Sequence, residues 1–166
     1  MILDYRELFD YVKKQRARLI EALEKIPNEE FVRDRGLSFG SVKDVLAHTV
    51  MVEDNWLHYR AAGIAAGTSL TLEGFKELEH VKRYAAEVDS KTERLFNKMT
   101  ESDLQREVKR TTRDGREEVF SLEQILYHLP IEVIYHFGEI FGEFWKMNTD
   151  APYCSYLAYS IAKAGT

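Results

Sequence analysis

The chain has 166 residues, 45% hydrophobic and 31% charged, which fits one globular domain with a full core over residues 1–166. The formal net charge of −5 argues against a phosphate-binding surface, so we expect no nucleic-acid partner. The first residues lack the apolar core of a signal peptide, and no apolar run approaches the roughly 20 residues of a membrane span. Cys154 is the only cysteine, which excludes an internal disulfide and suits a reducing compartment. We therefore expect a cytoplasmic protein without a membrane partner.

Apolar periodicity predicts an all-α fold, with long helices over about 3–26, 41–66, 71–99 and 121–147. Pro27 ends the first of these ranges. The second and fourth ranges begin at Ser41 and Ser121, each with a capping-box spacing to the residue three positions later. In the third range we expect a turn at 72–74 before the helix.

Two shorter elements are expected outside the long helices. Asp114-Gly115 lies between β-prone residues, so the sequence predicts a short hairpin or loop over 107–121, before the fourth helix. Residues 152–164 are expected to form a short terminal helix or coil.

The stretch 129–140 places a carboxylate and an imidazole four residues apart in an otherwise apolar helix. Residues with this spacing lie above one another on one helix face. His136 falls within the apolar stripe and Glu132 at its boundary, so both side chains can converge on one interior point. Burying a carboxylate is costly unless it is paired, hydrogen-bonded or bound to a metal.

His48 is the candidate partner for this pair. It recurs with Val45, Thr49 and Val52 at helical spacing, so it also faces the core. Two imidazoles and one carboxylate suit a divalent ion such as zinc, nickel, iron or manganese, with positions left for water or substrate. The alternative is that each histidine is a hydrogen-bonded core residue, and spacing alone leaves both interpretations open.

Further polar residues are weaker candidates. His128 is one turn before Glu132 and is expected at the surface, where it is a reserve ligand. Glu139 and Glu143 are candidates to orient the His136 ring through its N–H group. We expect the remaining histidines, His58 and His80, to face solvent.

Two motifs of this chain resemble those of the DinB superfamily, the DinB/YfiT-like metalloenzymes. They are the helix start Ser-Val-Lys-Asp-Val-Leu-Ala-His, which ends at His48, and His136-Phe-Gly-Glu in the late helix. The resemblance covers about residues 4–159 and implies a four-helix bundle whose metal is held by three histidines. His48 matches the first ligand and His136 the last, whereas Glu132 stands where the family usually has histidine. This departure implies either a changed metal preference or a lost metal.

The resemblance also implies a reaction class, because the family includes transferases and isomerases that use low-molecular-weight thiols. We expect a metal-dependent enzyme, a thiol-dependent S-transferase or a hydrolase, whose ion is held by His48, Glu132 and His136 and whose substrate is a small molecule. The alternative is a non-catalytic, metal-free bundle that binds a small ligand or acts as a dimeric stress-related protein.

A second apolar stripe predicts a homodimer. It lies on the side of the late helix opposite His136, and a helix that is apolar on both sides is enclosed by other elements. Its residues are Tyr127, Ile131, Ile134, Phe141 and Trp145. The terminal segment 152–159 is expected to cover part of this face and a second copy the rest.

Overall fold

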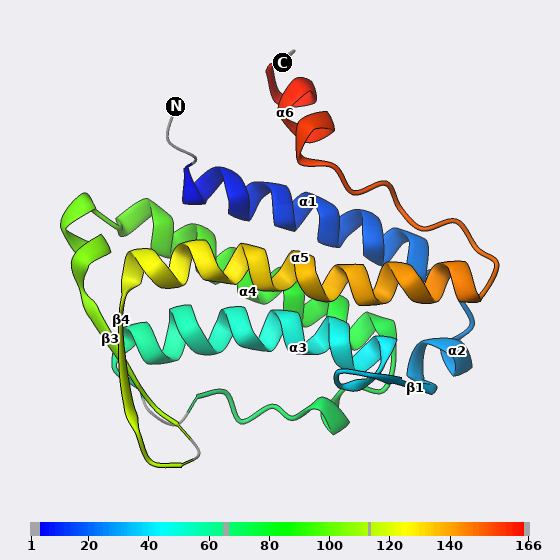
Figure 1. The fold of residues 1–166 in the computed structure, drawn as a ribbon, viewed down its shortest axis with the longest axis horizontal. Coiled ribbons are helices and arrows are strands. Elements are labelled where there is room, and N and C mark those ends of the chain that lie inside the picture. The colour runs from blue at the N-terminus through cyan, green and yellow to red at the C-terminus, as the bar shows by residue number, and fades with distance from the viewer. Residues whose placement is uncertain (1–3, 65–66, 113, 165–166) are drawn as a thin grey trace.

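The computed structural model describes residues 4–64, 67–112 and 114–164, and its long helices lie side by side (Figure 1). These helices are α1 (Tyr5–Leu23), α3 (Val42–Asp54), α4 (Leu78–Lys98) and α5 (Leu122–Lys146). Helices α1 and α3 each contact both α4 and α5. The prediction of a predominantly helical fold is confirmed.

The capping residues set the starts of two of these helices. The Ser41 hydroxyl accepts a hydrogen bond from the backbone N–H of Asp44, and the Ser121 hydroxyl accepts one from Gln124. In both boxes the side chain at the third position returns to the N-cap backbone, so the first turns of α3 and α5 have satisfied donors. Helix α5 then continues through Pro130 without interruption.

The described residues also form two small antiparallel hairpins, one of which was predicted. The hairpin of β3 (Glu107–Thr111) and β4 (Glu117–Ser121) occupies the predicted range. The pair β1 (Asp34–Leu37) and β2 (Gly40–Ser41) was not predicted, and neither was the short helix α2 (Asn28–Val32). Gly36 and Gly40 have φ values of 67° and 96°, a conformation that glycine adopts without steric cost.

The predicted boundaries differ most at the end of the second long helix. Helix α3 ends at Asp54 and passes into a π-helical turn, η1 (Asn55–Tyr59), and a 3-10 turn, η2 (Arg60–Ala62). Residues 65–66 of the predicted range lie outside the described residues. The expected turn at 72–74 is the 3-10 turn η3 (Leu72–Gly74), and a further one, η4 (Glu101–Gln105), follows α4.

The core consists of apolar side chains from all four long helices. Its fully buried members include Leu19, Leu46, Val81, Leu126, Leu129, Phe137, Ile140 and Phe144. Removing such a side chain leaves a cavity, so leucine-to-alanine changes here are expected to cost about 2–5 kcal/mol. This packing fixes how α3 faces α5, and therefore where their polar residues meet.

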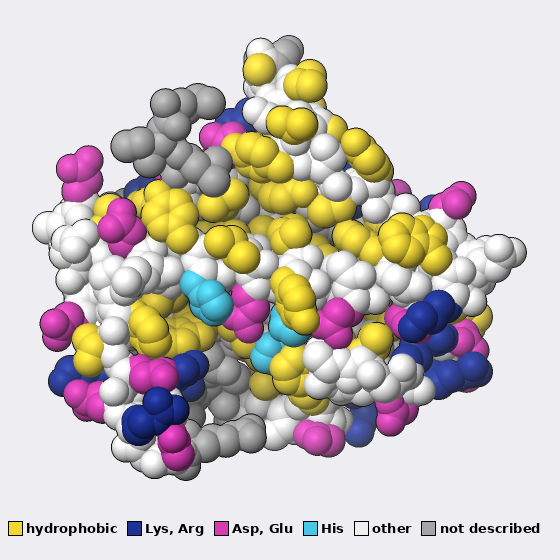
Figure 2. Space-filling view, in the orientation of Figure 1, with side chains coloured by type: hydrophobic (Ala, Val, Ile, Leu, Met, Phe, Trp, Pro, Cys, Tyr) yellow, Lys and Arg dark blue, Asp and Glu magenta, His cyan; other side chains and the backbone are white. Residues whose placement is uncertain are grey.

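The second apolar face of α5 is only partly covered. The terminal helix α6 (Tyr156–Ala164) stands beyond the outer side of α1, and Tyr159 packs there with its hydroxyl donating to Asp10 at 2.7 Å (Figure 1). Ile131 and Trp145 remain 65% and 71% exposed, and hydrophobic side chains form a band on this side of the molecule (Figure 2). Among the described residues, no helix combines the length and the apolar character that crossing a membrane requires.

Candidate metal centre

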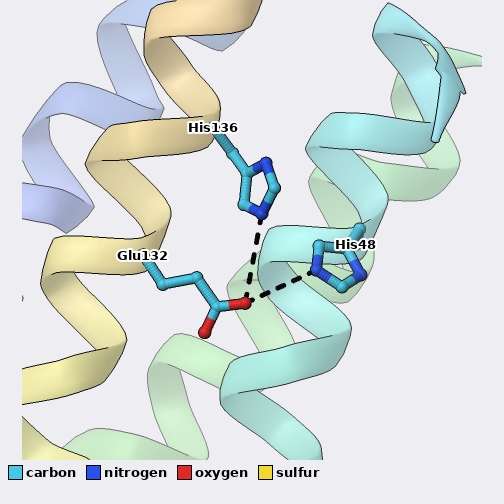
Figure 3. A group of neighbouring side chains, drawn as sticks. All are labelled: His48, Glu132 and His136. Carbon is cyan, nitrogen blue, oxygen red and sulfur yellow. Dashed lines mark ion pairs between the residues drawn. The ribbon is translucent and has the colours of Figure 1, made fainter. Parts of the chain in front are cut away.

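The three candidate ligands meet between α3 and α5 (Figure 3). Glu132 Oε1 lies 3.7 Å from His48 Nε2 and 4.0 Å from His136 Nε2. The ligand atoms of all three residues lie within 4.8 Å of one another. These separations are too long for hydrogen bonds, but atoms that each lie about 2.0–2.2 Å from one ion are separated by about 3–4 Å. The residues therefore fit a divalent ion placed between them.

His136 is oriented by Glu139. The Nδ1 atom of His136 lies 2.7 Å from Glu139 Oε1. A carboxylate at this position accepts the proton on Nδ1, so the lone pair of Nε2 is free to face Glu132. Burial alone would raise the pKa of the Glu139 carboxyl, but hydrogen bonds from Ser38 and His136 outweigh it and hold that pKa below its usual value. This is the carboxylate–histidine pairing found behind metal ligands.

The two carboxylate oxygens of Glu132 face different sides of the site. Oε1 faces the two imidazoles, whereas Oε2 lies 3.0 Å from His128 Nε2. The nearby His48 imidazole holds the pKa of Glu132 below its usual value, with His128 and His136 adding to this and partial burial opposing it. His128 lies at the surface, as expected, and it contacts the outer oxygen of Glu132 and lies outside the ligand group.

Other candidates lie elsewhere. Glu143 does not contact His136, since its carboxylate binds Arg35 at 3.2 Å and Lys146 at 2.5 Å. Its proposed orienting role is therefore wrong.

Two histidines outside the site also differ from expectation. His58 is not solvent-facing, because its Nε2 lies 3.2 Å from the buried hydroxyl of Thr92 and burial lowers its pKa. His80 is partly exposed, accepts a hydrogen bond from the Lys76 backbone and pairs with Glu77.

Sequence reasoning missed the residues between β1 and β2. The Phe39 ring stacks on the His48 imidazole at 3.7 Å between ring centres and meets His136 edge-on. Ser38 donates its backbone N–H and its hydroxyl to Glu139 at 3.1 and 3.0 Å. The turn therefore covers one imidazole and fixes the carboxylate behind the other. The only sequence signal for it was the pair of glycines, Gly36 and Gly40, on either side.

Comparison with known proteins agrees with this fold. Two similar solved structures are a mycothiol-dependent maleylpyruvate isomerase, 16% identical, and a histidine-to-alanine mutant of it, 15% identical, each with a TM-score of 0.54. Each match covers 81% of this chain and 59% of the other, so the chain spans about three fifths of the length of those proteins. At this identity the likeness concerns the fold alone. No curated protein matches the chain. The sequence pattern of the DinB family matches residues 1–150, and the chain belongs to that family.

Proposed function

We propose that the protein is a metal-dependent enzyme that transfers a small thiol to an electrophilic substrate, with a divalent ion held by His48, Glu132 and His136. The observation that carries the proposal is the orientation of His136. Its Nδ1 is engaged by Glu139, and its Nε2 faces the same carboxylate oxygen that faces His48. A purely structural histidine of the core would direct both nitrogens to hydrogen-bond partners.

The residues of the site have separate roles in the proposed reaction. His48, Glu132 and His136 would hold the ion, which supplies Lewis-acid chemistry by lowering the pKa of a bound thiol or water near neutral pH. Glu139 keeps the proton of His136 on Nδ1, and Phe39 excludes water from one face of His48. Thiol dependence is supported by the mycothiol-dependent neighbour of similar fold. The hydrolase alternative would use a bound water in place of the thiol.

Metal binding is tested with thermal melts of chelator-treated protein in the presence of zinc, nickel or manganese. A ligand that binds only the native state raises the melting temperature, so we expect a metal-dependent shift in the wild type. His48→Ala should abolish the shift, whereas His80→Ala, a histidine outside the site, should retain it. Absence of a shift in the wild type would end the metalloenzyme proposal and favour the metal-free alternative.

Thiol transfer is tested with cysteine, glutathione or mycothiol and the chromogenic electrophile 1-chloro-2,4-dinitrobenzene. In this reaction the thiolate sulfur forms a bond to carbon, chloride leaves with its electron pair, and the thiol proton goes to solvent. We expect metal-dependent turnover with at least one thiol and none in His136→Ala. Metal binding without thiol transfer, together with metal-dependent ester hydrolysis, would favour the hydrolase alternative.

We also propose a homodimer that uses the exposed face of α5 and α6. Its support is a run of apolar residues that are each at least 65% exposed, namely Ile131, Tyr135, Trp145, Leu157 and Ile161. Contiguous apolar surface of this kind marks interaction sites. Sedimentation at micromolar concentration should give a dimer for the wild type and a monomer for Trp145→Glu. Val119→Glu, an exposed apolar residue on β4, is the control, and a monomeric wild type would refute the dimer.

A further inference from the structure

A cavity of about 350 Å³ adjoins the candidate metal centre. Its lining residues are Trp56, Arg110, Phe120, Gln124, Ile125 and His128. His128 belongs to both places, since its Nε2 lies 3.0 Å from Glu132 Oε2. Figure 2 shows hydrophobic atoms below and to the left of the histidines, with Lys and Arg side chains beside them. A molecule in this cavity would thus lie beside His128, which contacts the outer oxygen of Glu132.

Two arginines approach the Trp56 ring: Arg110 lines this cavity, whereas Arg60 lines an adjoining groove that also includes Arg110. The guanidinium carbons of Arg60 and Arg110 lie 4.9 and 5.5 Å from the centre of the Trp56 ring. Arg60 directly follows the π-helical turn that carries Trp56, and Arg110 comes from β3 of the neighbouring hairpin. Such π-helical turns are frequent at functional sites. Two consecutive turns, η1 and η2, and the distant strand β3 therefore bring two positive charges to one ring.

The positive charge of Arg60 is not neutralised by the protein. Arg110 pairs with Glu118, whereas Arg60 has no carboxylate partner within the described residues. Burial and the nearby Arg110 lower the pKa of Arg60, as expected where like charges approach each other. The groove of about 830 Å³ that Arg60 lines also contains Arg106, Lys109 and Glu107. Lys109 and Arg110 pair with Glu117 and Glu118, so Arg60 is a cation of this region that is available to an anionic ligand.

Arg16, a buried arginine of the same protein, has different partners. Arg16 donates to Glu53 at 2.7 Å and to Asp89 at 2.8 Å. Arg60 instead faces an aromatic ring and a second guanidinium, an arrangement that leaves its N–H donors for a ligand. A planar guanidinium binds carboxylate in two parallel hydrogen bonds, and it stacks on aromatic rings at the same time.

We propose that this cavity and the adjoining groove, which share Arg110, form the substrate subsite of the metal centre and take a molecule with an apolar or aromatic body and a terminal carboxylate. The body packs against Trp56 and Phe120, the carboxylate binds Arg60 where the groove meets the cavity, and the other end reaches the ion beside Glu132. This assignment rests on the proposed function, because the reacting end is placed by the metal. Either the electrophile or the thiol can supply the carboxylate.

The test uses Trp56 as the reporter, since the chain has only two tryptophans and Trp145→Phe makes Trp56 the single one. Metal-free Trp145→Phe protein is titrated with 4-phenylbutyrate and with its uncharged analogue, 4-phenylbutanol. Removing the metal excludes carboxylate binding to the ion itself. We expect a saturable change in Trp56 fluorescence with the carboxylate and at least about tenfold weaker binding of the alcohol, the loss expected for a charge-assisted hydrogen bond.

The variant Arg60→Gln should weaken 4-phenylbutyrate binding by about tenfold or more. Arg60 makes no ion pair within the described residues, so the variant should melt at the same temperature as the wild type. The control is Lys109→Gln, which removes a positive charge from the same groove that is already paired with Glu117, and it should change affinity less than about twofold. Equal weakening by both variants, or equal binding of acid and alcohol, would overturn the proposal.

Zinc binding to Arg60→Gln is measured in parallel and should match the wild type. Zinc binding without carboxylate binding overturns the subsite alone, and carboxylate binding without zinc binding overturns the metal centre alone. Comparing 3-mercaptopropionate with 4-phenylbutyrate identifies the source of the carboxylate. Tighter binding of 4-phenylbutyrate assigns it to the electrophile, and tighter binding of 3-mercaptopropionate assigns it to the thiol.

Discussion

Two clusters of ionisable side chains lie on different sides of α3, and they differ in how far the protein satisfies them. On one side, His48 faces Glu132 and His136 of α5 at distances of 3.7 Å and more. On the other, Glu53 binds Arg16 of α1 at 2.7 Å, and Arg16 also binds Asp89 of α4 at 2.8 Å. The two residues of α3 are five positions apart, which rotates them by about 140° around the helix.

The second cluster is closed. Arg16 and Glu53 are almost fully buried, and the Thr92 hydroxyl donates to the remaining oxygen of Glu53 at 2.7 Å. Every charge of this cluster has an ionic partner inside the protein, although Arg16 Nε makes no hydrogen bond, and the cluster joins three helices. The triad at His48 is open, because its three ligand atoms converge within 4.8 Å while the Glu132 oxygen lies 3.7 and 4.0 Å from the two imidazole nitrogens, too far for hydrogen bonds. A ligand site is therefore indicated by polar atoms that converge without bonding one another, and buried charge alone does not indicate one.

The closed cluster should give the largest loss of stability. Arg16→Met leaves Glu53 and Asp89 unpaired, and breaking a buried ion pair in this way typically costs about 3–5 kcal/mol. Urea unfolding measures the change in the free energy of unfolding. The control Arg18→Met, at an exposed position of the same helix, should stay within about 0.5 kcal/mol. A loss below about 1 kcal/mol for Arg16→Met would contradict the structural assignment of this cluster.

The open triad should instead respond to metal. At a metal concentration 100 times the dissociation constant, the wild type should gain about 2.7 kcal/mol in the free energy of unfolding. Glu132→His should keep this gain and shift the preference toward zinc and nickel, because imidazole is a softer ligand than carboxylate. If Glu132 is structural, the free energy of unfolding of the variant instead falls by roughly 1–3 kcal/mol with or without metal, because the polar partner of Glu132 loses its hydrogen bond. Melts of both proteins with zinc, nickel and manganese decide between these outcomes.

Two glutamates of α5 are expected to respond differently to mutation, because one orients a candidate metal ligand and the other belongs to a buried ion pair. Glu139→Gln removes the acceptor behind His136 and should weaken zinc affinity by about 10–100-fold with the fold intact. Glu143→Gln removes half of a buried ion pair with Arg35 and should lower stability while leaving zinc affinity unchanged. Calorimetric zinc titrations and urea unfolding of both variants provide the two readouts. The same response from both glutamates would contradict the distinction.

The open triad was within reach of sequence reasoning because each of its residues lies on a helix. Helical periodicity placed His136 inside, Glu132 at the edge and His48 on a core-facing stripe, and the structure brings these residues together. Pairing of two helices from different parts of the chain came from the family resemblance. The turn with Ser38 and Phe39 was missed, because a hairpin of four and two residues carries little periodicity.

The closed cluster was not predicted. Asp89 lies among many charged residues of α4, a pattern typical of a solvated helix face, but it binds the buried Arg16. A single sequence does not show which charge on a polar helix face finds a partner on another helix. The misplacement of His58 has the same cause, since Thr92, its partner, lies on α4. Pairings within one helix follow from spacing, whereas pairings between helices depend on the packing of the whole fold.

The smallest expected effect concerns pH and His58, which adjoins the closed cluster through Thr92. Burial lowers the pKa of His58, with Lys91 and Arg94 adding to the shift and Asp54 and Glu53 opposing it. In the unfolded chain this imidazole has its ordinary value near 6.5, so below that pH the unfolded state binds a proton that the folded state does not. Stability should therefore fall as pH decreases from about 6.5, with a slope of at most about 1.4 kcal/mol per pH unit from this group.

Urea unfolding between about pH 7.5 and 5 measures this slope. His58→Gln keeps an amide near the Thr92 hydroxyl but cannot titrate, so its stability should change less with pH than that of the wild type. His80→Gln, at a partly exposed position, should retain the wild-type slope. Equal slopes in all three proteins would mean that His58 binds its proton as readily in the folded state as in the unfolded one. In that case the closed cluster would not extend to His58, and its boundary would lie at Thr92.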